Sequence, residues 1–168
     1  RKLLPELSKW IGIVAVLGSW VLSSLLLWPS WFHQESYPQL TIPWFELNQK
    51  SVTLGIQLEP LNLMMLFVVS FISLWVQIYS LGYMKDDERS PVFFAYLSLF
   101  TFSMLGLVVS PNLLELYFFW ELVGVCSFLL IGFWYYKPEA KKAAKKAFIM
   151  TRIGDIGLFI AICLIYWQ

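Results

Sequence analysis

Glu121, Arg152 and Asp155 stand out in this sequence because each is a charged residue deep inside a long apolar run. A charged side chain near the centre of a membrane span costs about 2.5–3.5 kcal/mol on insertion scales, so few helices retain one without a reason. An apolar setting favours a protonated carboxyl, whereas a nearby cation favours the carboxylate. Movement of a cation near Glu121 would therefore switch its affinity for a proton, which predicts proton-transfer chemistry at this position.

Arg152 and Asp155 are three residues apart, which puts them on one face of a helix. One interpretation is a local ion pair that neutralises itself in a medium of low dielectric constant. The other is a pair that exchanges partners with a second buried charge such as Glu121. Glu121 also has two interpretations: a group that takes up and releases a proton, or a carboxylate that a neighbouring helix satisfies and that has no transport role. The spacing leaves both interpretations open.

The remaining chemical groups predict no second site. Glu115 lies about one turn into its apolar run and is expected at the membrane interface, without a function. His33 is the single histidine, and one imidazole makes no metal site. Cys126 and Cys163 lie inside apolar runs and are expected to be small buried hydrophobic residues. No nucleotide-binding loop, nucleophile triad or metal-ligand spacing is present, so any redox chemistry is expected elsewhere.

Five segments have the length and apolar character of membrane-spanning helices. A helix rises about 1.5 Å per residue, so about 20 residues cross a hydrocarbon core of roughly 30 Å. Only 14% of the residues are charged, against about 25% in soluble domains. The composition therefore predicts an all-α polytopic membrane protein and excludes a disordered chain or a basic nucleic-acid-binding face. The predicted spans are Trp10–Trp28, Leu61–Met84, Pro91–Val109, Leu113–Tyr136 and Ala147–Trp167.

The connections between these spans predict the orientation of the chain. Residues 29–57 are expected to form one long loop, and residues 85–90 and 137–146 short charged loops. Alternating spans place residues 1–9 on the same side as the two charged loops. That side then holds every Lys and Arg outside the spans except Lys50, and such an excess is typical of the cytoplasmic side.

Two runs of residues resemble the antiporter-like subunits of respiratory complex I. The first covers residues 117–135 and reads YFFWELVGVCSFLLIGFWY, and the second covers residues 146–157 and reads KAFIMTRIGDIG. Shorter matches are LEPL at 58–61, IYSLGYM at 78–84 and FFAY at 93–96. The likeness extends over about residues 52–167 and is greatest to the largest member, subunit L of NADH-quinone oxidoreductase, whose group includes mitochondrial chain 5 and its plastid and cyanobacterial counterparts.

This resemblance implies an N-terminal piece of a larger antiporter-like helical bundle. Residues 1–57 would be the first span and outer loop, residues 58–110 the second and third spans, and residues 111–168 the start of the proton-translocating helical repeat. Glu121 would correspond to a family glutamate that pairs with a lysine on a discontinuous helix outside this sequence. Arg152 and Asp155 would correspond to charged residues of the family's next helix. The chain departs mildly from the family at residues 59–62, which read EPLN where the family often has DPLS.

The function implied is proton translocation within a complex I-like NAD(P)H- or ferredoxin-quinone oxidoreductase. The chain itself would carry no cofactor, while partner membrane subunits and their assembly would supply flavin, iron–sulfur clusters and quinone. A bacterial cell membrane is expected, with an organellar inner or thylakoid membrane as the alternative. Two other functions stay open: the large subunit of a multisubunit Na⁺/H⁺ antiporter or inorganic-carbon uptake complex, and a scaffold whose buried charges are fixed ion pairs.

Overall fold

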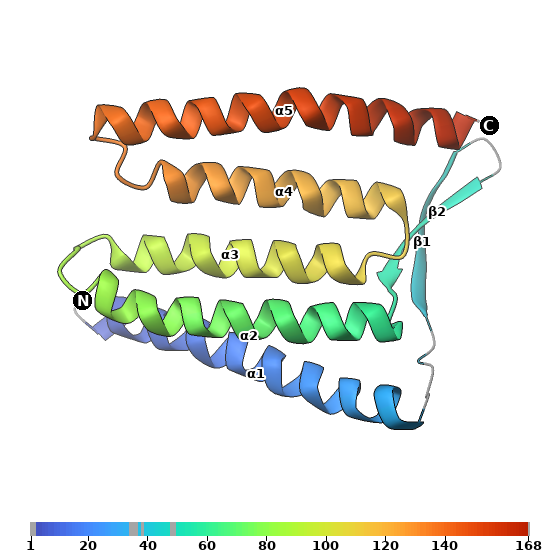
Figure 1. The fold of residues 1–168 in the computed structure, drawn as a ribbon, viewed down its shortest axis with the longest axis horizontal. Helices are drawn as coiled ribbons and strands as arrows, with labels where there is room; N and C mark the ends of the chain where they lie inside the picture. Colours follow the sequence, from blue (N-terminus) through green and yellow to red (C-terminus); the bar gives the residue numbers. More distant parts are fainter. Residues whose placement is uncertain (1–2, 34–36, 38, 48–49, 168) are drawn as a thin grey trace.

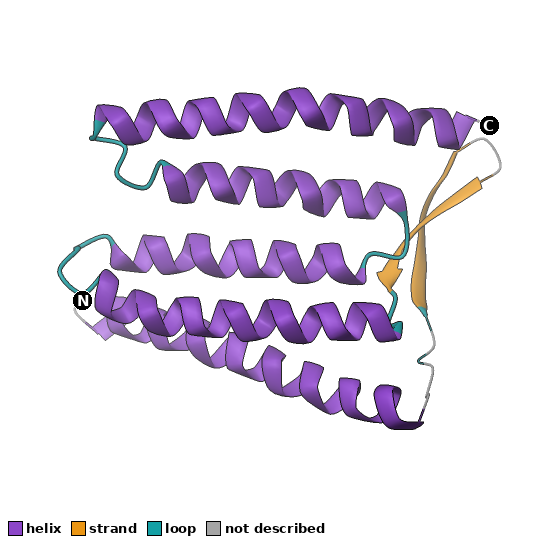
Figure 2. Cartoon of the chain, viewed as in Figure 1, coloured by secondary structure: helices purple, strands orange, loops and turns teal. Residues whose placement is uncertain are grey.

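The computed structural model describes residues 3–33, 37, 39–47 and 50–167, which form a bundle of five helices with a β-hairpin at one end (Figures 1 and 2). Helices α2 to α5 lie side by side and run in alternating directions, and α1 lies against α2 at an angle (Figure 1). In chain order the elements are α1 Leu3–His33, β1 Leu40–Leu47, β2 Lys50–Ile56, α2 Pro60–Tyr83, α3 Ser90–Val109, α4 Leu113–Ile131 and α5 Pro138–Trp167.

Each of the five helices found in the described residues is long and apolar enough to cross a membrane. Large apolar side chains remain exposed on their outer faces, among them Trp10, Trp75, Phe118 and Ile153. Such extensive apolar exposure is incompatible with water and fits a lipid or protein environment. The predicted fold class is therefore confirmed: the chain is a polytopic helical membrane protein.

Four helix boundaries differ from the predicted spans by five residues or more. Two of them belong to α1, which runs over Leu3–His33 rather than Trp10–Trp28. Helix α4 ends at Ile131 rather than at Tyr136, because the chain turns at Gly132, whose N–H bonds back to the carbonyl oxygen of Phe128 at 2.9 Å. Helix α5 begins at Pro138 rather than at Ala147. Proline suits a first helical turn, and the Ala, Lys and Glu residues that follow are strong helix formers. The predicted charged loop at 137–146 is thus the first turns of a helix.

A β-hairpin occupies most of the segment that was predicted as a loop across residues 29–57. The antiparallel strands pair from Leu40 with Ile56 to Leu47 with Lys50, and their register shifts between Pro43 and Phe45. Thr, Ile, Val and aromatic residues favour an extended paired conformation, and a proline is tolerated at such an irregularity. The loop prediction was wrong because it relied on the prolines and overlooked these strand formers.

Two helix pairs illustrate how the bundle packs. Ile13 and Val16 of α1 form a buried cluster with Leu74 of α2. Between α3 and α4, a side chain at Gly106 would collide with the ring of Phe119, since a Cβ atom there would lie 2.3 Å from it. Small residues that let helices approach closely are typical of membrane bundles.

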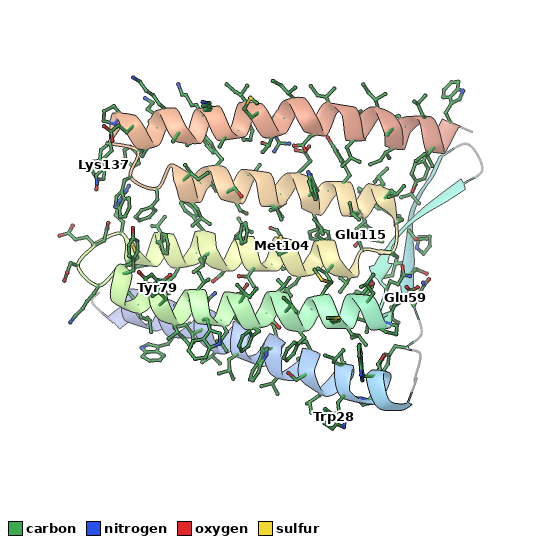
Figure 3. All side chains as sticks on the ribbon, in the orientation of Figure 1. Trp28, Glu59, Tyr79, Met104, Glu115 and Lys137 are labelled. Atoms are coloured by element: carbon green, nitrogen blue, oxygen red, sulfur yellow. The ribbon has the colours of Figure 1, made fainter. Side chains whose placement is uncertain are left out.

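The two ends of the bundle differ in character. Figure 3 shows Lys137 at one end, Glu59 and Glu115 at the other, and Met104 between them. The α2–α3 and α4–α5 connections share the end of Lys137, and the hairpin occupies the opposite end (Figure 1). The alternation expected from the sequence is therefore present in the fold.

Candidate functional site

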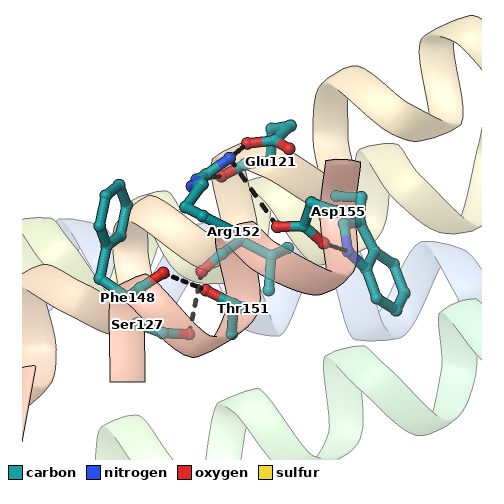
Figure 4. A network of polar contacts seen from close by, with 8 residues as sticks. Glu121, Ser127, Phe148, Thr151, Arg152 and Asp155 are labelled. Atoms are coloured by element: carbon teal, nitrogen blue, oxygen red, sulfur yellow. Dashed lines mark hydrogen bonds and ion pairs between the residues drawn. The ribbon is translucent and has the colours of Figure 1, made fainter. Parts of the chain in front are cut away.

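Helices α4 and α5 bring Glu121 and Arg152 into direct contact. Arg152 Nη1 forms an ion pair with Glu121 Oε2, and Arg152 Nη2 donates to the backbone carbonyl oxygen of Glu121 at 3.3 Å (Figure 4). The two residues are 31 positions apart in sequence, so the contact exists only because the helices pack antiparallel. Arg152 thus bonds across the helix interface.

Asp155 completes a three-residue cluster, which we call the charge cluster: Glu121, Arg152 and Asp155. Asp155 Oδ2 lies 3.9 Å from Arg152 Nη1, the outer limit of an ion pair. Its other oxygen, Oδ1, accepts a hydrogen bond from the indole N–H of Trp120 at 2.8 Å. The structure therefore favours the interhelical interpretation of Arg152 over an isolated local pair with Asp155.

The surroundings of Arg152 hold its guanidinium close against α4. The guanidinium carbon lies 4.7 Å from the centre of the Phe148 ring, a cation–π distance. Gly124 faces it from α4, and a Cβ atom at that position would lie 3.3 Å from Arg152 Nη2. Arg152 Nε is buried and has no hydrogen-bond partner among the described residues. The guanidinium therefore keeps an unused donor.

The charge cluster lies near the middle of both helices. Glu121 is eight residues after the start of α4, which is about 12 Å along the axis, and Arg152 is fourteen residues after the start of α5, about 21 Å along. The side chains of Arg152 and Glu121 are 27% and 23% exposed, and that of Asp155 is 11% exposed. When both carboxyls are ionised the cluster has one cation for two anions, so one proton would make it neutral.

Glu115 has a structural role that the sequence analysis did not predict. Its side chain is buried within the fold at the hairpin end of α4, and its Oε2 accepts a hydrogen bond from the backbone N–H of Gly55 in β2 at 3.0 Å. Its own N–H is capped by the side chain of Asn112 at 2.9 Å. An Asn followed three residues later by Glu, before an apolar run, is a known signal for a helix start and could have identified this cap.

The two cysteines differ in burial. Cys126 is buried and lies 3.7 Å from the hydroxyl of Ser103, as expected for a small core residue. Cys163 is exposed on α5, so the prediction of burial was wrong for it. It lines an open cavity together with Leu114 and Tyr117 of α4 instead of packing in the core. The side chain of His33 lies outside the described residues. Among the described residues, no three His, Cys, Asp or Glu side chains are grouped to hold a metal ion.

Two family models match the chain. Residues 44–94 match the N-terminal region of NADH-ubiquinone oxidoreductase (complex I) chain 5. Residues 110–168 match the transmembrane region shared by NADH:quinone oxidoreductase and the Mrp antiporter. The second match contains the whole charge cluster.

Curated relatives agree with these matches. The chain is 46% identical over 157 residues to NAD(P)H-quinone oxidoreductase subunit 5, chloroplastic, of Zygnema circumcarinatum, covering 94% of this chain and 22% of the relative. It is 53% identical over 126 residues to the same subunit of Chlorokybus atmophyticus, and the match covers 75% of this chain and 19% of the relative. It is 46% identical over 158 residues to NAD(P)H-quinone oxidoreductase chain 5 of Synechocystis sp., and the match covers 94% of this chain and 23% of the relative. The chain spans about a quarter or less of these relatives.

Solved structures show that the fold is shared more widely than the sequence. One is the membrane-bound sulfane sulfur reductase, an archaeal respiratory membrane complex, with a TM-score of 0.76 and 15% identity over 96% of this chain and 34% of that one. Another is the Mrp complex from Dietzia sp., with a TM-score of 0.70 and 22% identity, and the match covers 95% of this chain and 19% of that one. The solved structures show the fold alone, whereas the two family matches and the chain 5 relatives show that the chain belongs to the antiporter-like, chain 5 family of complex I membrane subunits.

Proposed function

We propose that this chain is part of a proton-translocating membrane subunit of a complex I-like NAD(P)H-quinone oxidoreductase. Its relatives are named as subunits of that oxidoreductase, which supports the assignment. The single observation that carries the transport role is the charge cluster, in which Glu121 meets Arg152 midway along two apolar helices. A buried carboxylate with a cation partner is the arrangement expected of a proton relay in a membrane.

The proposed mechanism is an exchange of partners by Arg152. While the guanidinium contacts Glu121, the carboxylate form of Glu121 is favoured and its proton is released. Asp155 lies 3.9 Å away on the same guanidinium, so a small movement of Arg152 toward it would deprive Glu121 of its cation. Glu121 would then take up a proton to avoid an unpaired buried charge.

The neighbours of the cluster are suited to such an exchange. The indole N–H of Trp120 already stabilises the Asp155 carboxylate, and the absence of a side chain at Gly124 leaves space for the guanidinium. The unpaired Nε of Arg152 offers a further donor to a new partner. A scaffold in which the charges are fixed would not need the spare donor.

The experiment is Glu121→Gln in the full-length protein, assembled in its complex and reconstituted into proteoliposomes. A positioned proton-transfer group contributes about 100-fold or more to a transfer rate, so the path through this cluster should close. The ratio of protons pumped to electrons transferred is expected to fall by the share that this path carries. Glu115→Gln is the matched control, because it makes the same change in the same helix away from the cluster, and it should keep the wild-type ratio. A fully assembled Glu121→Gln complex with the wild-type ratio would contradict the transport role.

Electron transfer is assigned to other subunits in this proposal. Flavin, iron–sulfur clusters and quinone would be bound by partner membrane and peripheral subunits, and this chain would contribute only the proton path. The membership of solved relatives in multisubunit membrane complexes supports partners of this kind. The Lys-rich end of the bundle would face the cytoplasm or the topologically equivalent compartment.

The antiporter alternative predicts a different assembly. A Na⁺/H⁺ antiporter would purify without iron–sulfur or flavin subunits and would transport ions without electron transfer. The similarity to the Mrp complex is 22% identity and reflects the fold, whereas the chain 5 relatives are 46–53% identical. Identification of the subunits that co-purify with the full-length protein would distinguish the two assemblies.

A further inference from the structure

A cavity of about 350 Å³ opens between α3, α4 and α5 at the Lys-rich end of the bundle. Its lining combines positive charge with an apolar wall. The positive side chains are Arg89, Lys141 and Lys145, and the aromatic part of the wall includes Tyr96, Phe128 and Phe133. No acidic side chain of the described residues lines it.

Arg89 is fixed at the edge of this cavity. Its Nη2 donates to the carbonyl oxygen of Phe133 at 2.6 Å. Its guanidinium carbon lies 4.8 Å from the centre of the Phe133 ring and 4.7 Å from that of Tyr135. Asp87, two residues earlier, accepts the indole N–H of Trp134 at 3.1 Å. Arg89 is therefore a positioned cation, anchored by its backbone and ring partners.

Lys141 and Lys145 are one helical turn apart in the first turns of α5 and so share one face. Ala144 on that face is buried, and a Cβ atom at Gly132 would lie 3.3 Å from its side chain, which shows how closely the end of α4 approaches. Within the described part of the chain, neither lysine forms an ion pair. Both ammonium groups are therefore available to an anion.

The depth of the cavity indicates what kind of anion it fits. The cations lie at the helix ends, where lipid headgroups are found, while Tyr96 and Phe128 belong to the turns next inside the span. A basic pocket between membrane helices, with apolar surface beneath it, matches an amphiphile with an anionic headgroup. We propose that this cavity binds an anionic phospholipid, with its phosphate near Arg89, Lys141 and Lys145 and an acyl chain along the aromatic wall. The proposal is independent of proton transfer at Glu121.

The test compares two charge-matched double variants in the full-length protein within its purified assembly. Lys141→Gln/Lys145→Gln removes two cations that line the cavity. Lys142→Gln/Lys146→Gln removes the same charge from the same two turns of α5, at positions that do not line it. Each assembly is exchanged into nanodiscs of phosphatidylcholine with increasing phosphatidylglycerol, and the phosphatidylglycerol retained after extraction is counted by native mass spectrometry.

A basic side chain at an anionic surface contributes about fivefold to binding, so the cavity double variant should bind phosphatidylglycerol roughly 25-fold more weakly at one site. The control double variant should retain as much phosphatidylglycerol as the wild type, and so should Lys141→Arg/Lys145→Arg, which keeps both positive charges. Equal loss in both double variants would overturn the proposal by showing a diffuse surface effect. If both double variants retained as much phosphatidylglycerol as the wild type, the cavity would have another occupant and the proposal would be overturned. If the wild type retained phosphatidylcholine and phosphatidylglycerol equally, the site would have no preference for charge, which would also overturn it.

Discussion

Gly124 determines how closely Arg152 can approach Glu121. A Cβ atom at Gly124 would already lie 3.3 Å from Arg152 Nη2, and the branched side chain of valine would reach further. Overpacking of this kind typically costs about 1–3 kcal/mol or displaces the group it meets. Gly124→Val should therefore move the guanidinium away from Glu121 and lower the proton-to-electron ratio of reconstituted complex toward that of Glu121→Gln.

Gly154→Val is the control for Gly124→Val. Gly154 is also helical and lies beside the charge cluster in sequence, but no described atom would lie within 4 Å of a Cβ atom there. It should keep the wild-type ratio. If Gly124→Val pumped normally while fully assembled, the space beside Arg152 would have no part in transport.

At the scale of single residues, the sequence predicted the members of the charge cluster but not how they pair. The costly placement of Glu121, Arg152 and Asp155 in apolar runs was sufficient to identify them. The pairing of Arg152 with Glu121 depends on the rotation of α4 against α5, which a pattern within one helix does not contain. For the same reason the hydrogen bond from Trp120 to Asp155 had no signal in the sequence.

The hairpin and α4 are joined through the side chain of Glu115. Glu115→Ala removes the acceptor of the Gly55 N–H and leaves that backbone donor without its partner. The loss of a hydrogen bond to a charged group costs about 1.5–3 kcal/mol. Amide hydrogen exchange at Gly55 and along β2 should become faster, measured by mass spectrometry on the assembled protein. Glu115→Gln keeps a side-chain oxygen and should exchange more slowly than Glu115→Ala, and equal rates in all three proteins would show that Glu115 does not hold the hairpin.

The α2–α3 connection should respond to acid through Asp87. The N–H of Arg89 at 2.8 Å and the indole N–H of Trp134 hold the pKa of Asp87 below its ordinary value of 3.8. Because the pKa is lower in the fold, the carboxylate stabilises the connection above about pH 3.8, and this contribution is lost as pH falls through the folded pKa.

The measurement for Asp87 is iodide quenching of Trp134 fluorescence, in a protein whose other tryptophans are replaced by phenylalanine. Quenching should be constant from neutral pH down to about 4 and should rise below it in the wild type. Asp87→Asn should remove this acid step, since its side chain does not titrate. An identical acid step in Asp87→Asn would assign the change to another group.

Among the elements, the long apolar runs were predicted well because their signal is strong and local. The hairpin was missed because prolines at 38 and 43 suggested a loop, although the residues around them favour strands. The early start of α5 was missed because the lysines suggested a loop, whereas Pro138 and the alanines favour a helix regardless of charge. The charge of these residues therefore did not predict their backbone conformation, and the side of the membrane that it indicates stays a prediction.

At the scale of the whole molecule, the two ends of the bundle carry different charge. Lys85, Arg89, Lys137 and the lysines of early α5 gather at the end where α2 meets α3 and α4 meets α5, opposite the hairpin (Figure 1). Basic residues close to span ends resist translocation across the membrane, so they set the orientation of the protein. We expect the Lys-rich end in the cytoplasm or its equivalent, and the hairpin on the opposite side.

Single cysteines on the two ends would test this orientation in the full-length protein, after Cys126, Cys163 and every other cysteine of that protein are replaced by alanine. Glu139→Cys lies at the exposed start of α5, and Leu40→Cys lies at an exposed position of β1. A membrane-impermeant maleimide added to intact cells, or to vesicles of known sidedness, should label Leu40→Cys from the non-cytoplasmic side. It should label Glu139→Cys only after permeabilisation, and labelling in detergent checks that both thiols react. The reverse pattern would contradict the expected orientation and place the Lys-rich end on the non-cytoplasmic side.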